Sequence, residues 1–292
     1  MPRGVPTAGF RNRRPKMHSG ASALKIMEQI NRVPVVSRLE SDNEIDTRIK
    51  DRFDILEEMV EASMIGEVRS LIVSGPPGLG KSYTVEEKLK ASVVPNRIFR
   101  GYLRPPALYK LLYQNRMAGQ VLVFDDADAV FAEDTSLNLL KAVCDSTEQR
   151  VVSYMTETVL VDEESAEIIP KTFEFNGTVI FITNLDMDLM IERGHRLAVH
   201  LQALISRSHY IFLGMRNARD FLIRIKQIQK RGLLASRGLN ESQQAEVMEY
   251  IEEKQLELRE LSLRMAIKLA DIRHHSGSAW KRIANITCCR EK

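Results

Sequence analysis

The sequence predicts an α/β fold with a parallel sheet, followed by an all-helical region. Three short apolar runs, at residues 70–74, 121–126 and 178–184, end in small or polar residues, as buried parallel strands do. Helical patterns separate these runs, and alternating strands and helices are typical of a parallel sheet with helices on its faces. After Gly214 the strand patterns stop, and helical patterns continue to about residue 285.

The remaining elements follow from the spacing of apolar residues along the chain. A helix over residues 44–66 leads into the first strand, and a glycine-rich loop separates that strand from a helix over residues 83–91. Two further strands, at residues 98–99 and 210–213, complete a sheet of five. We expect the other helices of this part at residues 107–116, 136–146 and 197–206.

The composition indicates a globular protein without a membrane span. The chain has 292 residues, of which 28% are charged and 44% hydrophobic. No apolar run approaches the roughly 20 residues that a bilayer span requires, and the first 20 residues lack the apolar stretch of a secretory signal. Three cysteines, Cys144, Cys288 and Cys289, are too few and too badly placed for a disulfide framework. We therefore expect a reducing compartment, the cytoplasm.

Positive charge is concentrated at the N-terminus, although the net charge of the chain is only +3. Residues 1–20 contain five basic residues and no acid, among glycines and prolines, which predicts a disordered basic arm. Such an arm favours solubility, or it contacts nucleic acid or an acidic partner.

The loop after the first strand matches the phosphate-loop pattern Gly-x4-Gly-Lys-[Ser/Thr] at every fixed position. A strand before the loop and a helix after it are the context that this pattern requires. The glycines let backbone N–H groups close around phosphate oxygens, and the helix N-terminus adds a positive dipole end. Lys81 would reach the β- and γ-phosphates of ATP, and the Ser82 hydroxyl would bind Mg²⁺. The predicted nucleotide-contacting residues are Gly75, Pro76, Pro77, Gly78, Leu79, Gly80, Lys81, Ser82 and Tyr83.

Two acids follow four apolar residues at the end of the strand over residues 121–126. Ligands bind outside the carboxyl ends of parallel strands, so this is where a metal-binding carboxylate belongs. We expect Asp125 to hold Mg²⁺, directly or through water, and Asp126 to orient the attacking water as general base. The alternative interpretation is that both acids cap the next helix.

With these motifs, the chain resembles the AAA+ ATPases over residues 45–275. The motifs that carry the resemblance lie at residues 75–82, 124–131, 180–184, 203–207 and 261–264, in the order usual for the family. The sequence around the acids resembles that of AAA+ proteins encoded by bacteriophages, and its motifs resemble those of clamp loaders and branch-migration motors. The resemblance implies an αβα sandwich with a five-stranded parallel sheet and a small helical lid. It also implies hydrolysis of ATP to ADP and phosphate, a ring of subunits, six by family resemblance, and location in the host cytoplasm for a phage-encoded chain.

On this resemblance the chain has four segments. A basic arm and linker span residues 1–44, the nucleotide-binding core spans residues 45–214, a helical lid spans residues 215–285 and a tail spans residues 286–292.

The resemblance also assigns three further catalytic residues. Asn184 matches sensor 1 and would hold the lytic water together with Asp126. Arg207 resembles an arginine finger, which acts in trans on the γ-phosphate bound by the neighbouring subunit. Arg264 matches sensor 2, in the lid, on a helix for which Ser262 is a suitable N-cap. A turn asparagine and two solvated surface arginines are the alternatives, and Arg193 and Arg196 compete with Arg207 for the role of finger.

One residue departs from the family pattern, which usually has Glu where this chain has Asp126. The aspartate side chain is one methylene shorter, so the sequence leaves open a different position of the attacking water and slow turnover. This leaves open a nucleotide-dependent loader or scaffold, which uses ATP as a switch. A protein-remodelling unfoldase or chaperone and a small-molecule kinase are the other functional classes we consider.

The sequence does not specify which macromolecule such a motor moves. The loop at residues 101–104 could hold a polypeptide through Tyr102, or a nucleic acid through stacking of Tyr102 and a phosphate contact from Arg104. Residues 151–161 and 168–175 predict a β-hairpin with an acidic tip, which disfavours phosphate contact. The basic arm and the clamp-loader-like Arg207 favour nucleic-acid metabolism, with DNA as a possible substrate.

Overall fold

The computed structural model describes residues 40–162 and 165–291. The predicted basic arm at residues 1–20 lies outside the described residues, and of the arm and linker together only residues 40–44 are described. The chain divides into two units after Ser41, and the unit that begins at Asp42 carries every element described below.

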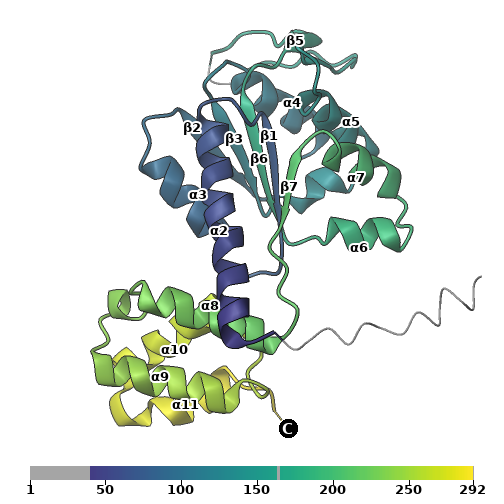
Figure 1. Cartoon of the computed structure of the whole chain (residues 1–292). Coiled ribbons are helices and arrows are strands. Elements are labelled where there is room, and N and C mark those ends of the chain that lie inside the picture. Colours follow the sequence, from purple (N-terminus) through teal and green to yellow (C-terminus); the bar gives the residue numbers. More distant parts are fainter. Residues whose placement is uncertain (1–39, 163–164, 292) are drawn as a thin grey trace, which may run out of the picture. The chain divides into compact units, whose positions relative to one another are not determined.

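A parallel sheet of five strands forms the centre of this unit (Figure 1). The strand order is β2-β3-β6-β1-β7, so the strand of the phosphate loop, β1, and the strand of the two acids, β3, are separated by β6. This confirms the predicted α/β fold and its five strands. The strands are β1 (Ser70–Ser74), β2 (Asn96–Arg100), β3 (Val121–Asp125), β6 (Thr178–Thr183) and β7 (His209–Phe212).

Helices cover both faces of the sheet, as the αβα sandwich requires (Figure 1). One face packs against α2 (Asp42–Met64) and α3 (Lys81–Lys90). The other face packs against α4 (Pro105–Gln114), α5 (Asp134–Val143) and α7 (Ala198–Ile205). The short helices η1 (Asp128–Phe131) and α6 (Met187–Glu192) follow β3 and β6.

Alternation along the strands divides the apolar core into two clusters. In β3, Leu122 and Phe124 face one cluster, while Val121 and Val123 face the other, and all four side chains are at most 1% exposed. A strand buried on both faces is apolar at consecutive positions, which is why the central strands appear in the sequence as continuous apolar runs.

The predicted hairpin is present between α5 and β6. Its strands β4 (Val151–Ser153) and β5 (Thr172–Glu174) pair antiparallel, and a further bridge joins Val161 to Ile168 near the tip. The regular strands are shorter than expected, because the chain between them leaves the ladder over residues 155–159.

The chain after β7 is helical, with its own apolar core around Tyr250 and Trp280. The last helix ends at Thr287 and Leu258 bridges to Cys289, so ordered structure extends past the expected end of the lid at residue 285. The limits of core, lid and tail remain predictions. The elements are α8 (Ala218–Lys230), η2 (Ala235–Arg237), α9 (Glu241–Lys254), α10 (Leu263–Ser276), η3 (Gly277–Ala279) and α11 (Trp280–Thr287).

Candidate functional site

The phosphate loop connects β1 to α3 through glycines in left-handed conformations. Gly78 has φ 75° and Gly80, the N-cap of α3, has φ 95°, a region that residues with a Cβ rarely adopt. A Cβ on Gly78 would also lie 2.6 Å from the Cβ of Ser262. The loop therefore requires glycine at this position for both its conformation and its packing, and it directs the N-terminus of α3 toward the site.

Lys81, in the first turn of α3, is only 5% exposed. Its ammonium group donates to Gly75 O at 2.6 Å, Pro76 O at 2.9 Å and Asn184 Oδ1 at 2.9 Å. Burial lowers the pKa of Lys81 to about 8, against the opposing effect of Asp126. The ammonium group of Lys81 thus lies among oxygen atoms at the carboxyl edge of the sheet, where a bound phosphate would contact it.

Ser82 and Asp125 meet across the gap between the phosphate loop and β3. Ser82 Oγ donates to Asp125 Oδ1 at 2.7 Å, and Asp125 is 3% exposed. The other carboxylate oxygen of Asp125 accepts from Arg100 Nε at 2.8 Å, and Arg100 also pairs with Glu86. A hydroxyl and a carboxylate oxygen at one point are the hard donors that Mg²⁺ prefers.

The protein ligands at this point are few. In the parts of the chain that the structure describes, no group of three or more His, Cys, Asp or Glu side chains could hold a metal ion by itself. This fits Mg²⁺, which usually keeps several waters and takes one or two protein ligands together with substrate phosphates.

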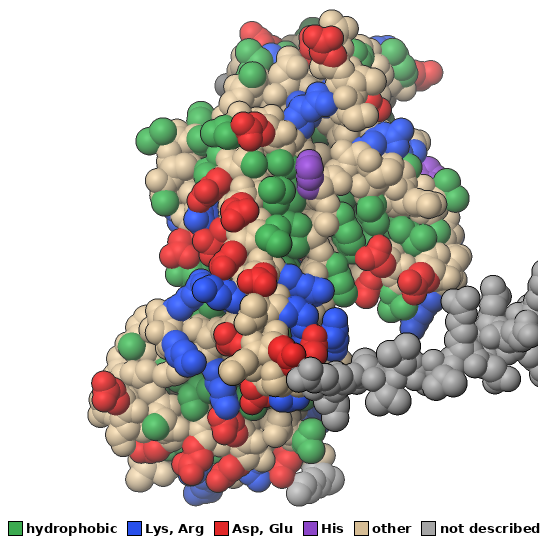
Figure 2. Space-filling view, in the orientation of Figure 1, with side chains coloured by type: hydrophobic (Ala, Val, Ile, Leu, Met, Phe, Trp, Pro, Cys, Tyr) green, Lys and Arg blue, Asp and Glu red, His purple; other side chains and the backbone are tan. Residues whose placement is uncertain are grey.

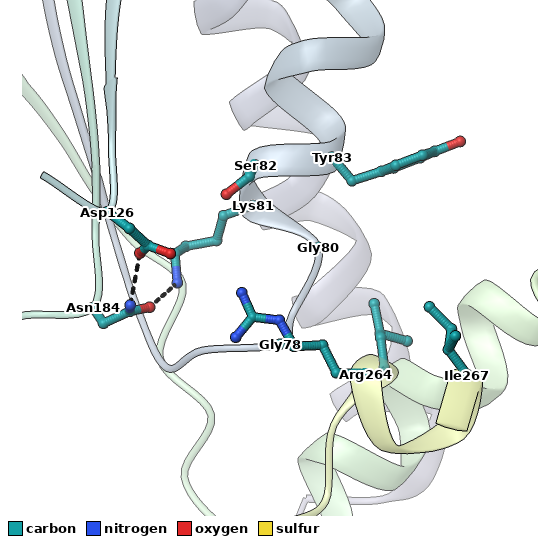
Figure 3. A pocket seen from close by; sticks show the side chains of 10 residues that line it. Gly78, Gly80, Lys81, Ser82, Tyr83, Asp126, Asn184, Arg264 and Ile267 are labelled. Carbon is teal, nitrogen blue, oxygen red and sulfur yellow. Dashed lines mark hydrogen bonds between the residues drawn. The ribbon is translucent and has the colours of Figure 1, made fainter. Parts of the chain in front are cut away.

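Asp126, the second acid, projects from the end of β3 with φ 52°. Aspartate adopts this left-handed conformation more readily than most residues do. Asn184 Nδ2 donates to Asp126 Oδ1 at 2.8 Å, and the same amide accepts from Lys81 through its oxygen (Figure 3). Asn184 therefore links the lysine of the phosphate loop to the acid of β3.

A third acid, Asp128, lies two residues after Asp126, at the start of η1. Thr183 Oγ1, from the last residue of β6, donates to Asp128 Oδ1 at 2.5 Å, and the Asn184 backbone supplies a further hydrogen bond. Burial raises the pKa of Asp128, and the hydrogen bond from Thr183 opposes that shift. Asp128 thus fixes the position of Thr183, the residue that precedes Asn184.

The helical region closes the site from the opposite side. Leu263 N, at the start of α10, donates to Gly78 O at 2.9 Å, and Ser262 Oγ caps the helix by accepting from Met265 N, which confirms the predicted N-cap. Arg264 extends from this helix end toward the phosphate loop (Figure 3). A cavity of about 170 Å³ lies between these elements. Its lining residues are Gly78, Gly80, Lys81, Ser82, Tyr83, Asp126, Asn184, Leu263, Arg264 and Ile267.

A second cavity, of about 450 Å³, shares Gly80 and Tyr83 with the first and lies between α3 and α8. Arg224 of α8 lines it and is 3% exposed. The Arg224 guanidinium lies 3.3 Å from the centre of the Phe53 ring and donates through Nε to Leu79 O at 3.3 Å. Burial lowers the pKa of Arg224 to about 9. This arginine ties α8 to the phosphate loop and to α2.

The predicted site residues are only partly brought together. Arg207 lies outside both cavities, where Nη1 donates to Ala203 O at 2.8 Å and Nε lies 3.5 Å from Asp145 Oδ2. The two prolines of the loop, Pro76 and Pro77, face a different cavity, between the loop and the turn before α8.

Three residues at the site were missed in the sequence. Arg100 is the last residue of β2, so the rule that ligands meet the carboxyl ends of parallel strands could have indicated it. Asp128 stands two residues after the acid pair and could have been noted as a third acid. Arg224 interrupts the apolar pattern of α8, and nothing in the sequence alone places it against the phosphate loop.

Comparison with known proteins finds a relative encoded by a bacteriophage. No protein-family model matches the sequence. An uncharacterised 36.7 kDa protein from the nrdC-mobD intergenic region of Enterobacteria phage T4 is 35% identical over 250 residues, which span 84% of this chain and 76% of the phage protein. The chain belongs to the family of this phage protein. The expected resemblance to phage-encoded proteins is thereby confirmed.

Among solved structures, similarities to two proteins of low sequence identity are found. A mutant of RuvB from Thermotoga maritima has a TM-score of 0.46 and 16% identity, covering 87% of this chain and 70% of its own. NtrX from Brucella abortus, in complex with ADP, has a TM-score of 0.42 and 13% identity, covering 88% of this chain and 59% of its own. The strand order of this chain, with the phosphate loop after β1 and the acid pair at the end of β3, agrees with the α/β fold expected from the sequence.

The structure contains no helix, within the residues it describes, that combines the length and apolarity of a membrane span.

Proposed function

We propose that this phage-family protein binds and hydrolyses ATP, and that turnover moves or remodels a macromolecule. The observation that carries the proposal is the chain of contacts across the strand ends. Ser82 meets Asp125 at 2.7 Å, and Asn184 lies between Lys81 and Asp126 at 2.9 and 2.8 Å. A phosphate-binding cation, a metal-binding pair and a candidate base with its orienting amide are thus adjacent.

Each side chain has a role in this proposal. Lys81 and the loop amides bind the β- and γ-phosphates, and Arg264 approaches them from α10. Ser82 and Asp125 would hold Mg²⁺, which when bound neutralises charge on the phosphates. Asp126 accepts a proton from the attacking water while the Asn184 amide orients that water.

Arg207 is assigned to act between subunits. Its side chain is 35% exposed and its contact with Asp145 is long, so it is accessible to a neighbouring molecule. In a ring it would stabilise the charge on the γ-phosphate held by the next subunit. Arg193 and Arg196 remain the competing candidates.

The first experiment measures ATP binding by calorimetry and steady-state hydrolysis with Mg²⁺. We expect Lys81→Ala to abolish binding, and Asp126→Asn to retain binding while lowering the rate by at least about 10²-fold, as loss of a general base does. Lys141→Ala, a lysine of α5 outside the site, is the control. Wild-type protein that ignores ATP and Mg²⁺ would rule the proposal out.

The second experiment tests action in trans. Arg207→Ala and Lys81→Ala proteins should each be inactive, and mixing them should restore part of the activity, because mixed interfaces combine an intact lysine with an intact arginine. An absence of rescue, with assembly confirmed by light scattering, would remove Arg207 from the site.

A nucleotide switch with little turnover is the second candidate function. The conformation of Asp126 favours it, since the short side chain is held by Asn184 at 2.8 Å and starts from a left-handed backbone. Equal, near-zero rates for wild type and Asp126→Asn, with tight ATP binding in both, would support the switch and exclude the motor.

The macromolecule is proposed to be nucleic acid, on the basic N-terminal segment of the sequence. Rates measured with single-stranded DNA, duplex DNA and an unfolded protein would identify the substrate class. Stimulation by unfolded protein alone would instead indicate an unfoldase.

A further inference from the structure

The β-hairpin carries an unusual share of the exposed apolar side chains. Of the sixteen large hydrophobic residues that are exposed among the described residues, five lie within residues 151–175, a tenth of that part of the chain. We call these five residues the hairpin surface. They are Val151 (51% exposed), Met155 (74%), Val159 (64%), Val161 (39%) and Ile168 (70%).

The same segment is strongly acidic. Residues 151–175 contain six acids and one base in the sequence. Among the described residues Glu157, Glu167 and Glu174 are exposed, whereas Asp162 is buried. In Figure 2, hydrophobic and acidic side chains both appear over the part of the molecule that carries β5 in Figure 1. Phosphate-backbone binding depends on positive charge, so this surface disfavours nucleic acid. The bridge between Val161 and Ile168 and the cavity that Val159 and Ile168 line bring exposed apolar groups together beside charged ones, which is typical of a protein-binding surface.

The hairpin packs against α4. Tyr109 Oη donates to Pro170 O at 2.8 Å, and the Tyr109 ring packs against Tyr154 and Phe173 with centroids 5.4 and 5.0 Å apart. Nearer the tip, Gln114 Nε2 donates to Asp162 Oδ1 at 2.6 Å. These contacts hold the surface in shape before any partner arrives, which lowers the entropic cost of binding.

A small cavity opens in the hairpin itself. It has a volume of about 180 Å³ and lies between the segment before Val161 and the segment after Ile168, with Tyr109 and Tyr154 in its lining. Pockets for drug-sized molecules begin at about 300 Å³, so this one suits an inserted apolar side chain. No residue lines both this cavity and the one at the phosphate loop.

We propose that the hairpin surface binds a segment of another protein in which apolar side chains are flanked by lysines or arginines. One apolar side chain enters the cavity, neighbouring ones cover Val159 and Ile168, and the basic groups face the exposed carboxylates of Glu157 and Glu167. Charge complementarity selects this partner over an acidic or neutral peptide. The site is separate from nucleotide binding and does not depend on ATP hydrolysis.

The test uses full-length protein and two fluorescent peptides as probes. Both contain the same core of four alternating leucines and serines, flanked by two lysines at each end in one peptide and two glutamates in the other. Fluorescence anisotropy at low salt should show binding of the lysine peptide only. Ile168→Asp should weaken that binding by at least about tenfold, as loss of a central apolar contact does.

Val93→Asp is the matched control, because Val93 is fully exposed and lies outside the hairpin. Its affinity for the lysine peptide should equal that of wild type. Since Ile168 is itself exposed, its substitution should leave the unfolding temperature unchanged, which is checked in parallel.

Several results would overturn the proposal. These are no binding of the lysine peptide, equal binding of both peptides, or equal losses in Ile168→Asp and Val93→Asp. A lower oligomeric mass for Ile168→Asp would show instead that the surface joins copies of this chain. Binding of a labelled single-stranded oligonucleotide that Ile168→Asp abolishes would assign the surface to nucleic acid.

Discussion

Lys81 combines burial with positive charge, and this makes nucleotide affinity dependent on pH. Its pKa is lowered to about 8 by burial, so the free protein loses this charge as the pH rises through 8. A bound triphosphate would keep the lysine protonated, and binding at higher pH must therefore take up a proton. We expect ATP affinity to fall about tenfold between pH 7 and pH 9, measured by calorimetry.

Lys81→Arg is the control for this pH dependence. Arginine stays charged throughout this range, so the affinity of the variant should be nearly constant whatever its absolute value. A wild-type affinity that does not change from pH 7 to pH 9 would show that Lys81 is already fully protonated at the higher pH.

Asp128 is expected to position Asn184 without touching the nucleotide. Asp128→Ala removes the acceptor of the Thr183 hydroxyl, so the chain before Asn184 should lose its fixed position. We expect kcat to fall by up to about 10²-fold with little change in KM, because misplacement of about 1 Å has effects of this size. Asp128→Asn keeps an acceptor oxygen and should retain most of the activity. Equal rates for the two variants would mean that charge, not position, is the contribution of Asp128.

Residue types and spacing predicted the members of the site that belong to a contiguous motif. Lys81, Ser82 and Asp125 were predicted in this way, and the structure places Ser82 within hydrogen-bonding distance of Asp125 and Lys81 within hydrogen-bonding distance of Gly75 in the loop. Arg100 was missed although its place at the end of β2 could have indicated it, and Arg224 was not predicted because its position depends on which helix lies beside the loop. That information is tertiary, and a single sequence does not contain it in readable form.

At the scale of elements, the phosphate loop and the start of α10 are in direct contact through the hydrogen bond from Leu263 N to Gly78 O. Gly78→Ala would bring a Cβ to 2.6 Å from Ser262 Cβ at a backbone φ of 75°. We expect lower stability and weaker ATP binding, because either the loop or α10 must move. Gly119→Ala is the matched control, at φ 78° with no atom within 4 Å of the new Cβ, and should cost only the conformational strain, about 1 kcal/mol. Thermal unfolding and ATP titration of both variants measure the difference. Equal losses would show that the contact with Ser262 contributes nothing.

Element types were predictable because apolar spacing differs between strand and helix, while element ends were less so. The helix expected at residues 136–146 begins two residues earlier, at Asp134, and ends at Val143. Cys144 to Arg150 then turn toward the hairpin, where Arg150 donates to the Val143 and Gly177 carbonyls. The Val143 carbonyl at this helix end thus accepts from a side chain seven residues further along the chain, a contact that local preference does not predict.

At the scale of the whole unit, a buried ion pair joins the first helix to the helical region. Arg48 of α2 donates to Asp220 Oδ2 of α8 at 3.0 Å, and the Asp220 side chain is 1% exposed. Asp220→Ala should lower the free energy of unfolding by about 3–5 kcal/mol, since it leaves a largely buried guanidinium without this carboxylate. Urea unfolding gives the value.

The control for Asp220 is a surface pair within the helical region. Asp271 lies 3.8 Å from Arg237, and both side chains are more than 40% exposed. Asp271→Ala should change the free energy of unfolding by less than about 1 kcal/mol. Losses of similar size in the two variants would show that the pair between Arg48 and Asp220 contributes no more to the free energy of unfolding than a surface pair does.

The position of β6 between the phosphate-loop strand and the acid strand predicts where loss-of-function mutations should fall. It lies between β1 and β3 with all six residues buried, and its register aligns Ile180 with Leu71 on one side and Val123 on the other. The phosphate loop and the acid pair are therefore spaced by the width of this one strand, roughly 10 Å for two strand separations. A random screen for inactive but folded protein should thus recover changes at Ile180 or Phe181, neither of which can take part in any chemistry.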